Sequence, residues 1–369
     1  MDTAKVYFTT MDTPKQDSIP AKLTRLLEAA GLAQMNPKDK FIAIKTHFGE
    51  MGNVSYLKPV YARTIAQAVK AHEGRPFVTD CSTLYPGMRA NALDHLECAA
   101  MNGFSKDSCA CPVIIADGLT GHDEVEVPVP QGGRLESALF GRAFFDADAV
   151  ITLTHAKGCG VAAYGGAIKN ISMGCASKSG KMALHCEGKP IVIEDACLGC
   201  GFCLKACGQD AIKIYDHKAH IADNCAGCGH CITTCTHGAI VPDFPEQLDL
   251  MQNKMAEYAA AFVSARPCLH VAIAVDITAQ CDCFADNGAP VLPNIGMFAS
   301  TDPVALDQAI TDKINAQQTI AGSILEERHK DCDGRHLDAI NPATSWELQL
   351  AHAEEMGAGS RSYELVTVE

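Results

Sequence analysis

The stretches CLGCGFCLKAC, residues 197–207, and CAGCGHCITTC, residues 225–235, contain the most informative pattern in this chain. Each carries four cysteines in the order C-x2-C-x2-C-x3-C, so eight of the 19 cysteines lie in one short segment. Thiolates in such a repeated run are typical ligands of iron–sulfur clusters. Zinc sites use two C-x2-C pairs, so the pattern disfavours zinc. The run therefore predicts two clusters inside one small folded unit.

The spacing also predicts which cysteines share a cluster. It is that of bacterial-type ferredoxins, in which three thiolates of one run bind one [4Fe–4S] cluster and the fourth binds the other. Cys197, Cys200, Cys203 and Cys235 are expected to hold the first cluster, and Cys225, Cys228, Cys231 and Cys207 the second. The run usually ends in Cys-Pro, but Gly208 and Thr236 follow the last cysteines here. This difference bears on the cluster potentials rather than on ligation.

The composition of the 369-residue chain fits a globular protein of about two domains. Hydrophobic residues make up 47% and charged residues 20%, and no apolar run is long enough for a membrane span. The net charge of −14 disfavours binding to nucleic acid. The first 20 residues show no export signal, so we expect a cytoplasmic protein. So many thiols without such a signal suggest metal ligation in a reducing compartment.

Strand and helix patterns alternate on both sides of the cysteine-rich segment. Such alternation predicts a mostly parallel, Rossmann-like α/β sheet with helices on both faces. The expected strands are residues 5–10, 41–48, 76–80, 112–118, 149–155, 268–276 and 291–298, and the expected helices are residues 20–31, 59–72, 89–103, 135–147 and 303–316. We expect a discontinuous α/β domain of residues 1–189 and 245–369, and an inserted α+β ferredoxin-like domain of residues 190–244.

Polar and cationic side chains follow four of the expected strands. Open α/β sheets bind ligands beyond the carboxyl ends of their strands, so these loops predict a pocket. Its lysines, arginine and glycine-exposed amides favour an anionic small molecule. The candidate binding residues are Lys45, His47, Asn53, Asp80, Arg89, Lys169, Asn170 and Asp302, and the candidate catalytic residues are His155, Lys157 and Tyr85. Asp302 is also a candidate helix cap.

Other motifs give weaker signals. Residues 158–163 lack the third glycine of a dinucleotide-binding loop, and residues 174–182 lack the spacing and the Ser or Thr of a P-loop. ATP chemistry is therefore not expected, while a flavin or another organic cofactor is left open. Cys281 and Cys283 form a C-x-C sequence that could bind metal, although ordinary reduced thiols are the favoured interpretation. Cys159 could be structural or, beside lysines, reactive.

Several segments resemble the DUF362 proteins that carry a ferredoxin insert, a family of uncharacterised Fe–S centre proteins. The matching stretches are KTHFGEMGNVSYLKPVYAR, TDCSTLYPGMRANALDHL, VIIADG, THAKGCGVAAYGGAIKNISMGCASKSGK and CDCFADNGAPVLPNIGMFASTDPVALDQA, together with both cysteine runs. The resemblance implies the α/β fold and the two clusters. At residues 159–164 the chain departs from many relatives, with Cys159 in place of a histidine and Ala162 or Ala163 in place of a glycine.

Two functions are consistent with the sequence. In the first, a redox partner protein exchanges electrons with two [4Fe–4S] clusters, which serve an anionic small molecule or cofactor in the pocket. Lys45, His155, Lys157 and Lys169 would bind the anion, and His155 or Tyr85 would supply a proton. In the second, the chain is an electron carrier or partner-docking protein with no chemistry of its own. The chain outside the cysteine-rich segment is far longer than partner docking needs, which favours the first function.

Overall fold

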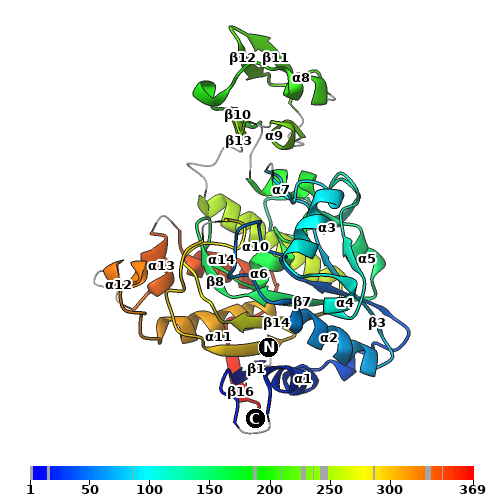
Figure 1. Cartoon of the computed structure of the whole chain (residues 1–369), viewed down its shortest axis with the longest axis vertical. Coiled ribbons are helices and arrows are strands. Elements are labelled where there is room, and N and C mark those ends of the chain that lie inside the picture. Colours follow the sequence, from blue (N-terminus) through cyan, green and yellow to red (C-terminus); the bar gives the residue numbers. More distant parts are fainter. Residues whose placement is uncertain are drawn as a thin grey trace.

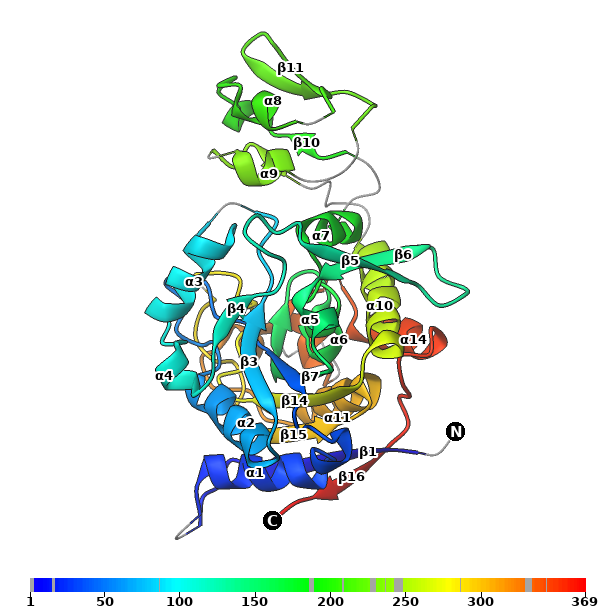
Figure 2. The same cartoon turned by 90° about the vertical axis from the view of Figure 1, so that its right-hand side faces the viewer.

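The computed structural model of the chain describes most of its length. The described residues are 3–14, 17–85, 87–185, 189–207, 209–225, 230–235, 237–241, 248–285, 287–328, 334–342 and 344–369. They form a large α/β body and a smaller lobe beyond helix α7 (Lys178–His185) (Figure 1). Both termini lie at the end of the body remote from the lobe (Figure 2).

An eight-stranded sheet forms the centre of the body, in the order β16-β1-β15-β14-β7-β2-β3-β4. The strands are β1 (Ala4–Thr10), β2 (Phe41–Lys45), β3 (Arg75–Asp80), β4 (Val113–Ile115), β7 (Ala149–His155), β14 (Cys268–Ala274), β15 (Gly296–Ser300) and β16 (Tyr363–Thr367). Strand β15 pairs antiparallel with β1 and β14, while every other ladder of this sheet is parallel. Seven strands therefore run in one direction, which confirms the mostly parallel α/β fold.

Helices cover both faces of the sheet because its strands are apolar on both sides. In β2, Ile42 and Ile44 pack into one hydrophobic cluster and Ala43 into the other, as strand alternation requires. The first face is covered by α1 (Ile19–Ala29), α2 (Pro59–Ala71), α3 (Ala92–Met101) and α4 (Lys106–Cys109). The second is covered by α5 (Ala143–Asp146), α6 (Ala167–Ile171), α10 (Leu248–Ala265), α11 (Pro303–Asn315), α13 (His336–Ile340) and α14 (Trp346–Glu355).

The prediction of a helix over residues 135–147 is wrong. Residues Ser137–Gly141 form strand β6, which pairs antiparallel with β5 (Glu124–Pro128), and only α5 is helical in this stretch. Ala138 and Phe140 are buried at a spacing of two residues, and Phe140 contacts the rings of Tyr258 and Phe262 in α10. This long-range packing outweighs the helical propensity of the segment. Similarly, the strand expected from residue 291 begins only at Gly296.

Several shorter elements complete the body. They are η1 (Ala33–Met35), β8 (Lys157–Cys159), β9 (Ala163–Gly165) and α12 (Ile324–Arg328). Strands β8 and β9 form a small hairpin directly after β7. None of the helices in the described ranges is long and apolar enough to cross a membrane.

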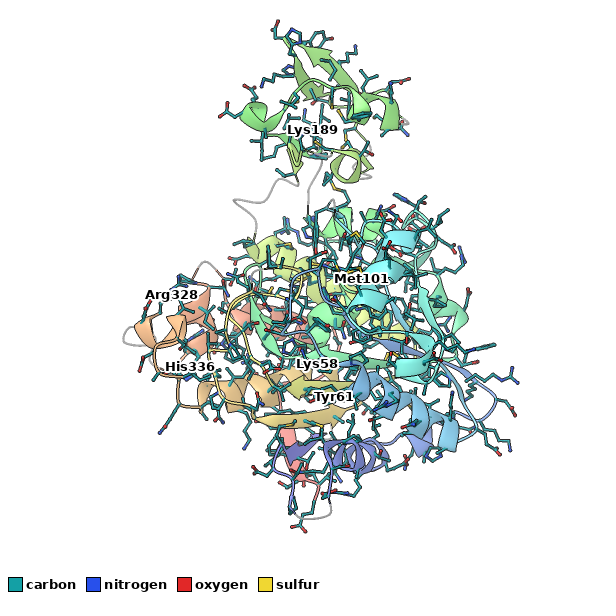
Figure 3. All side chains as sticks on the ribbon, in the orientation of Figure 1. Lys58, Tyr61, Met101, Lys189, Arg328 and His336 are labelled. Atoms are coloured by element: carbon teal, nitrogen blue, oxygen red, sulfur yellow. The ribbon has the colours of Figure 1, made fainter. Side chains whose placement is uncertain are left out.

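The smaller lobe contains both cysteine runs. Its elements are β10 (Ile191–Val192), η2 (Glu194–Ala196), α8 (Phe202–Ala206), β11 (Ile212–Tyr215), β12 (Lys218–Ile221), α9 (His230–Thr234) and β13 (Ile240–Val241). Strands β11 and β12 form a hairpin, and an exposed Lys189–Asp223 ion pair of 2.6 Å lies in the same lobe (Figure 3). Strand β10 pairs with β13, so the chain enters and leaves the lobe at one place. The boundaries predicted at residues 190 and 244 lie beside or within residues outside the described ranges.

Candidate functional site

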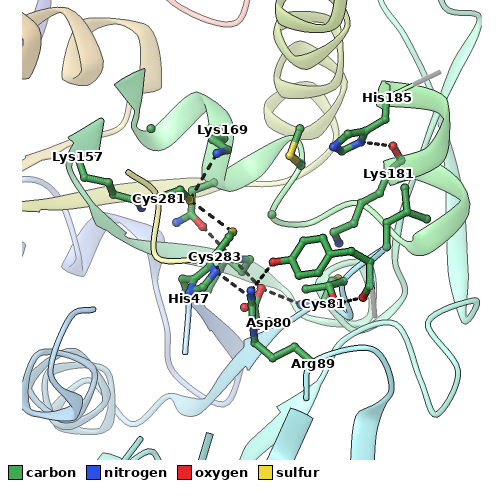
Figure 4. A pocket seen from close by; sticks show the side chains of 18 of the residues that line it. His47, Asp80, Cys81, Arg89, Lys157, Lys169, Lys181, His185, Cys281 and Cys283 are labelled. Atoms are coloured by element: carbon green, nitrogen blue, oxygen red, sulfur yellow. Dashed lines mark hydrogen bonds and ion pairs between the residues drawn. The ribbon is translucent and has the colours of Figure 1, made fainter. Parts of the chain in front are cut away.

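A cavity of about 110 Å³ lies at the carboxyl ends of β2, β3 and β7 (Figure 4). We call it the large cavity, to distinguish it from a smaller one in the lobe. The parallel strands bring their following loops to this one edge, as expected for an open α/β sheet. Eight of the predicted residues line the cavity, namely Lys45, His47, Asp80, Tyr85, Arg89, Lys157, Lys169 and Asn170. Further lining residues were not predicted for this pocket, among them Leu84, Lys181 and His185, and Cys281 and Cys283, which the sequence marked only as a C-x-C pair.

Three predicted site residues are not among those that line the cavity. His155 is buried, with Nδ1 2.9 Å from Asp282 Oδ1 and Nε2 2.7 Å from the Val275 carbonyl oxygen. Both of its ring nitrogens therefore contact oxygen atoms inside the protein. Asn53 donates to the Phe284 carbonyl at 2.9 Å and accepts from Ser55 N at 2.8 Å, which fixes the loop.

Asp302 lies at the opposite edge of the sheet from the cavity, because it follows β15, the one antiparallel strand of that sheet. Its carboxylate accepts from Val304 N and Ala305 N, each at 2.9 Å, and so caps α11. It also accepts from Ser360 N at 2.8 Å. The capping role predicted for Asp302 is confirmed, while its proposed place among the binding residues is not supported by this position.

Buried ion pairs fix the base of the cavity. Lys45 Nζ lies 3.0 Å from Asp80 Oδ1 and donates to Asn170 Oδ1 at 2.8 Å. Burial acts to raise the pKa of Asp80, but Lys45 and the other nearby cations outweigh it and hold the pKa well below its usual range. Arg89 pairs with Glu50 at 3.0 Å. Three further lysines, Lys157, Lys169 and Lys181, also line the cavity.

Arg89 also links two candidate functional side chains. Its Nη2 donates to the Tyr85 hydroxyl at 2.6 Å, and its Nη1 lies 2.8 Å from His47 Nε2. Burial, together with Arg89, lowers the pKa of His47 well below its usual value, so this imidazole is neutral at pH 7. Burial raises the pKa of Tyr85 well above its usual value, so its hydroxyl keeps its proton.

The loop after β14 contributes a fully buried carboxylate to the site. Asp282 contacts His155 at 2.9 Å and Lys157 Nζ at 3.3 Å. Burial acts to raise the pKa of Asp282, but His155 and Lys157 reverse this effect and hold it far below its usual range. Burial likewise acts to lower the pKa of Lys157, and Asp282 raises it above its usual value. The resulting ion pair anchors residues 281–283 against β7 and β8.

Two thiols flank this anchored carboxylate. Cys281 Sγ and Cys283 Sγ lie 3.4 Å apart, and both line the cavity. Lys169 Nζ lies 3.6 Å from Cys281 Sγ, and His47 Nε2 lies 3.3 Å from Cys283 Sγ (Figure 4). Lys169 Nζ also lies 2.9 Å from Cys159 Sγ. The C-x-C spacing was the only sequence signal for this arrangement. The cations come from distant parts of the chain and could not be assigned to it.

The smaller lobe contains a second cavity, of about 20 Å³. The four cysteines predicted to share the first cluster, Cys197, Cys200, Cys203 and Cys235, all line it. Ala219 N donates to Cys197 Sγ and Ala239 N to Cys235 Sγ, each at 3.3 Å, and such N–H···S bonds stabilise thiolates that bind metal. Gly199 has a φ of +63°, and a side chain there would collide with the His217 carbonyl. The four thiols and their backbone N–H donors are therefore a donor set of the kind that the predicted cluster needs.

The second predicted set is described only in part. Cys225 and Cys207 are partly buried and Cys231 is buried, whereas Cys228 lies outside the described residues. Ala211 N donates to Cys207 Sγ at 3.3 Å, as at the first site. Within the described ranges, no three His, Cys, Asp or Glu side chains converge as ligands of a single metal ion would. A cubane cluster is larger than a single metal ion, so its four thiolates lie further apart than the ligands of one ion.

One hydrophobic cluster joins the two cavities. Leu84, which lines the large cavity, and Met182 of α7 belong to the same cluster as four of the cysteines in the lobe. Those cysteines are Cys197, Cys203, Cys231 and Cys235. The apolar contact therefore runs from the thiol-lined cavity of the lobe to the cationic cavity of the body.

The chain belongs to a family whose only description is a domain of unknown function, DUF362. The family model matches residues 42–312, which include both cavities. No curated protein matches the chain. The resemblance to this family is thereby confirmed, and it defines a family rather than an activity.

Two solved structures are similar at a low level. The lactate racemase apoprotein from Thermoanaerobacterium thermosaccharolyticum has 9% identity and a TM-score of 0.35, over 74% of this chain and 51% of that one. A protein from Thermotoga maritima has 11% identity and a TM-score of 0.35, over 69% of this chain and 49% of that one. This chain thus spans about half the length of either structure.

Proposed function

We propose that this protein is an iron–sulfur redox protein, in which two [4Fe–4S] clusters in the smaller lobe exchange electrons with an anionic small molecule or cofactor in the large cavity. When bound, the clusters would supply or accept single electrons. The hydrophobic cluster that joins Leu84 and Met182 to the cysteines of the lobe is the observation that carries the proposal. A redox partner protein would deliver electrons to the lobe.

The residues of the large cavity suit an anionic ligand. Lys157, Lys169 and Lys181 line it, together with Arg89. Within the described ranges, Arg89 pairs with Glu50 and Lys157 with Asp282, whereas no acidic side chain forms an ion pair with Lys169 or Lys181. Lysine and arginine side chains recognise carboxylates and phosphates through charge-assisted hydrogen bonds. Tyr85 keeps its hydroxyl proton next to Arg89 and is the proton donor favoured by the geometry. His155, with both nitrogens in contact with internal oxygens, is instead a positioning residue for Asp282.

The proposal is tested with the full chain, purified without oxygen. The clusters are reduced with dithionite, and flavins and anionic metabolites are screened for reoxidation by visible absorbance. We expect at least one small molecule to reoxidise the clusters, and Arg89→Gln or Lys157→Ala to slow the reaction without loss of iron. Lys38→Ala is the matched control, since Lys38 forms only an exposed pair with Glu73.

The alternative is an electron carrier without chemistry of its own. If only proteins such as ferredoxins or flavodoxins reoxidise the clusters, and no small molecule does, the carrier replaces the proposal. If iron and sulfide assays find far fewer than about eight of each per chain, both functions fail.

A further inference from the structure

The turn at residues 281–284 presents two sulfur atoms to the large cavity. Phe284 N donates to the Cys281 carbonyl at 3.1 Å, which closes the turn. The side chain of Asp282 is fixed by His155 and Lys157, and its carbonyl accepts from Glu50 N at 3.0 Å. The turn is therefore held on both sides, and its two thiols remain adjacent at 3.4 Å with little freedom to separate.

The surroundings of these thiols favour one thiolate and one thiol. The contact with Cys283 lowers the pKa of Cys281 well below its usual value, and Lys169 and Lys157 add to this effect against the cost of burial. The pKa of Cys283 is raised by the same contact and by burial. A stabilised thiolate next to a protonated thiol is the arrangement that thiol–disulfide exchange requires.

We propose that Cys281 and Cys283 form a redox-active dithiol, which cycles with a disulfide and reduces a small anionic disulfide in the large cavity. The cationic wall formed by Lys157, Lys169 and Arg89 selects the charge of the substrate. This inference rests on the proposed function only for the source of the electrons. It assigns a reaction to the C-x-C sequence, whose two cysteines are not among the predicted cluster ligands.

The reaction balances as two exchange steps. The Cys281 thiolate attacks one sulfur of the substrate R–S–S–R, the substrate S–S bond breaks, and R–S⁻ leaves. Cys283 gives its proton to that leaving group and attacks Cys281 Sγ, so the Cys281–Cys283 bond forms and the second R–S⁻ leaves. Two electrons have then passed from the protein to the substrate. Two electrons and one proton restore the thiolate and thiol. Dithiothreitol supplies both electrons in vitro, and the clusters, when bound and reduced, would supply one each.

Another C-x-C sequence in the chain provides a matched control. Cys109 and Cys111 have the same spacing and are buried in a hydrophobic cluster of the body. Burial raises the pKa of Cys109, and it raises that of Cys111 to about 12. This pair should therefore remain a dithiol under conditions that oxidise Cys281 and Cys283.

The first experiment measures the redox state of each pair in the full chain. The protein is equilibrated anaerobically with dithiothreitol at graded ratios of oxidised to reduced reagent, alkylated, digested and analysed by mass spectrometry. We expect the 281–283 peptide to pass from doubly alkylated to internally bridged in one two-electron step, while Cys109 and Cys111 stay alkylated. In Cys283→Ser, this peptide should show no internal bridge, and glutathione disulfide in place of dithiothreitol should convert Cys281 to a mixed disulfide.

Four results would overturn the assignment. The 281–283 peptide could stay doubly alkylated at every ratio, or the two pairs could oxidise together. A bridge from Cys281 to Cys159 in Cys283→Ser would make Cys159, rather than Cys283, the thiol that pairs with Cys281. Zinc bound one per chain, lost only in Cys281→Ser and Cys283→Ser, would make the pair a metal site instead. None of these readouts depends on electron transfer from the clusters. A failure of the dithiol assignment can therefore be distinguished from a failure of the proposed function.

The second experiment tests the charge of the substrate. The reduced pair is oxidised with glutathione disulfide, which is anionic, or with cystamine, which is cationic, at equal concentration. We expect glutathione disulfide to react at least about tenfold faster, and added salt to reduce the difference. Equal rates, or a faster reaction with cystamine, would refute the substrate class.

Discussion

The smaller lobe and the large cavity both gather cysteines, but they compensate thiolate charge in different ways. In the lobe, burial raises the pKa of Cys203, and the neighbouring Cys235, Cys197 and Cys200 raise it further because thiolate charges repel one another. Backbone N–H groups at 3.3 Å are the donors that the structure gives to Cys197 and Cys235. In the large cavity, Lys169 lies beside Cys159 and Cys281.

This difference indicates two kinds of cysteine chemistry. Four thiolates around one cavity need a metal cluster to balance their charge, whereas a thiolate beside a lysine is already balanced and free to react. Residue type alone therefore does not distinguish a ligand from a nucleophile. The charges around each sulfur do, and the following variants test this distinction.

Replacing a predicted ligand should have the largest effect. In Cys203→Ser the first cluster loses one thiolate, so iron and sulfide should fall from about eight to about four per chain. The measurement is an anaerobic iron and sulfide assay with the visible and EPR spectra of the purified protein. Cys268→Ser, which changes a partly buried thiol of β14, should keep the full content. Equal losses in both variants would contradict the predicted ligand set.

Removing the metal should affect the two regions differently. After oxidation and chelation of iron, the lobe loses the cofactor that balances its thiolates, and we expect limited proteolysis within residues 189–241 to rise at least about tenfold. Alkylation of Cys281 should change less than about twofold, because its compensating lysine is part of the protein. Loss of Cys281 reactivity together with the metal would show that the two regions are not independent.

Removing the lysine should have the opposite pattern. Lys169→Met takes a cation away from Cys281, so its pKa should rise and its alkylation near pH 7 should slow about tenfold. The rate is measured against pH with iodoacetamide, and the whole profile should shift to higher pH because the thiolate is the reactive form. Lys169→Arg should keep most of the reactivity, and the iron content should be unchanged in both. An unshifted profile in Lys169→Met would exclude this role of the lysine.

The contact between the regions should give the smallest effect. Leu84→Ala removes part of the hydrophobic cluster that joins the cavity to the lobe. We expect proteolysis within the lobe to rise by a few fold, with iron content and Cys281 alkylation unchanged. Val54→Ala, at an exposed position, is the control. An identical response in the two variants would remove the evidence for this contact.

Local sequence patterns predicted much of the fold. The helix over residues 59–72 is α2, and the strand over residues 149–155 is β7, because a period of 3.6 or an apolar run is visible without knowledge of the neighbours. Residues 135–147 failed because the burial of Phe140 against α10 is a long-range contact. Eight of the eleven candidate pocket residues do line one cavity, because parallel strands end at the same edge.

The sequence by itself determined many of the strands and helices, such as α2 and β7, and the two cysteine runs, since both depend on residues close together. Only the tertiary structure decided the direction of β15, which puts Asp302 at the far edge. It also decided the neighbours of Cys283, to which His47 comes from 236 residues away. A sulfur atom's reactivity depends on the charges around it in space, and in this cavity those charges come from remote parts of the chain.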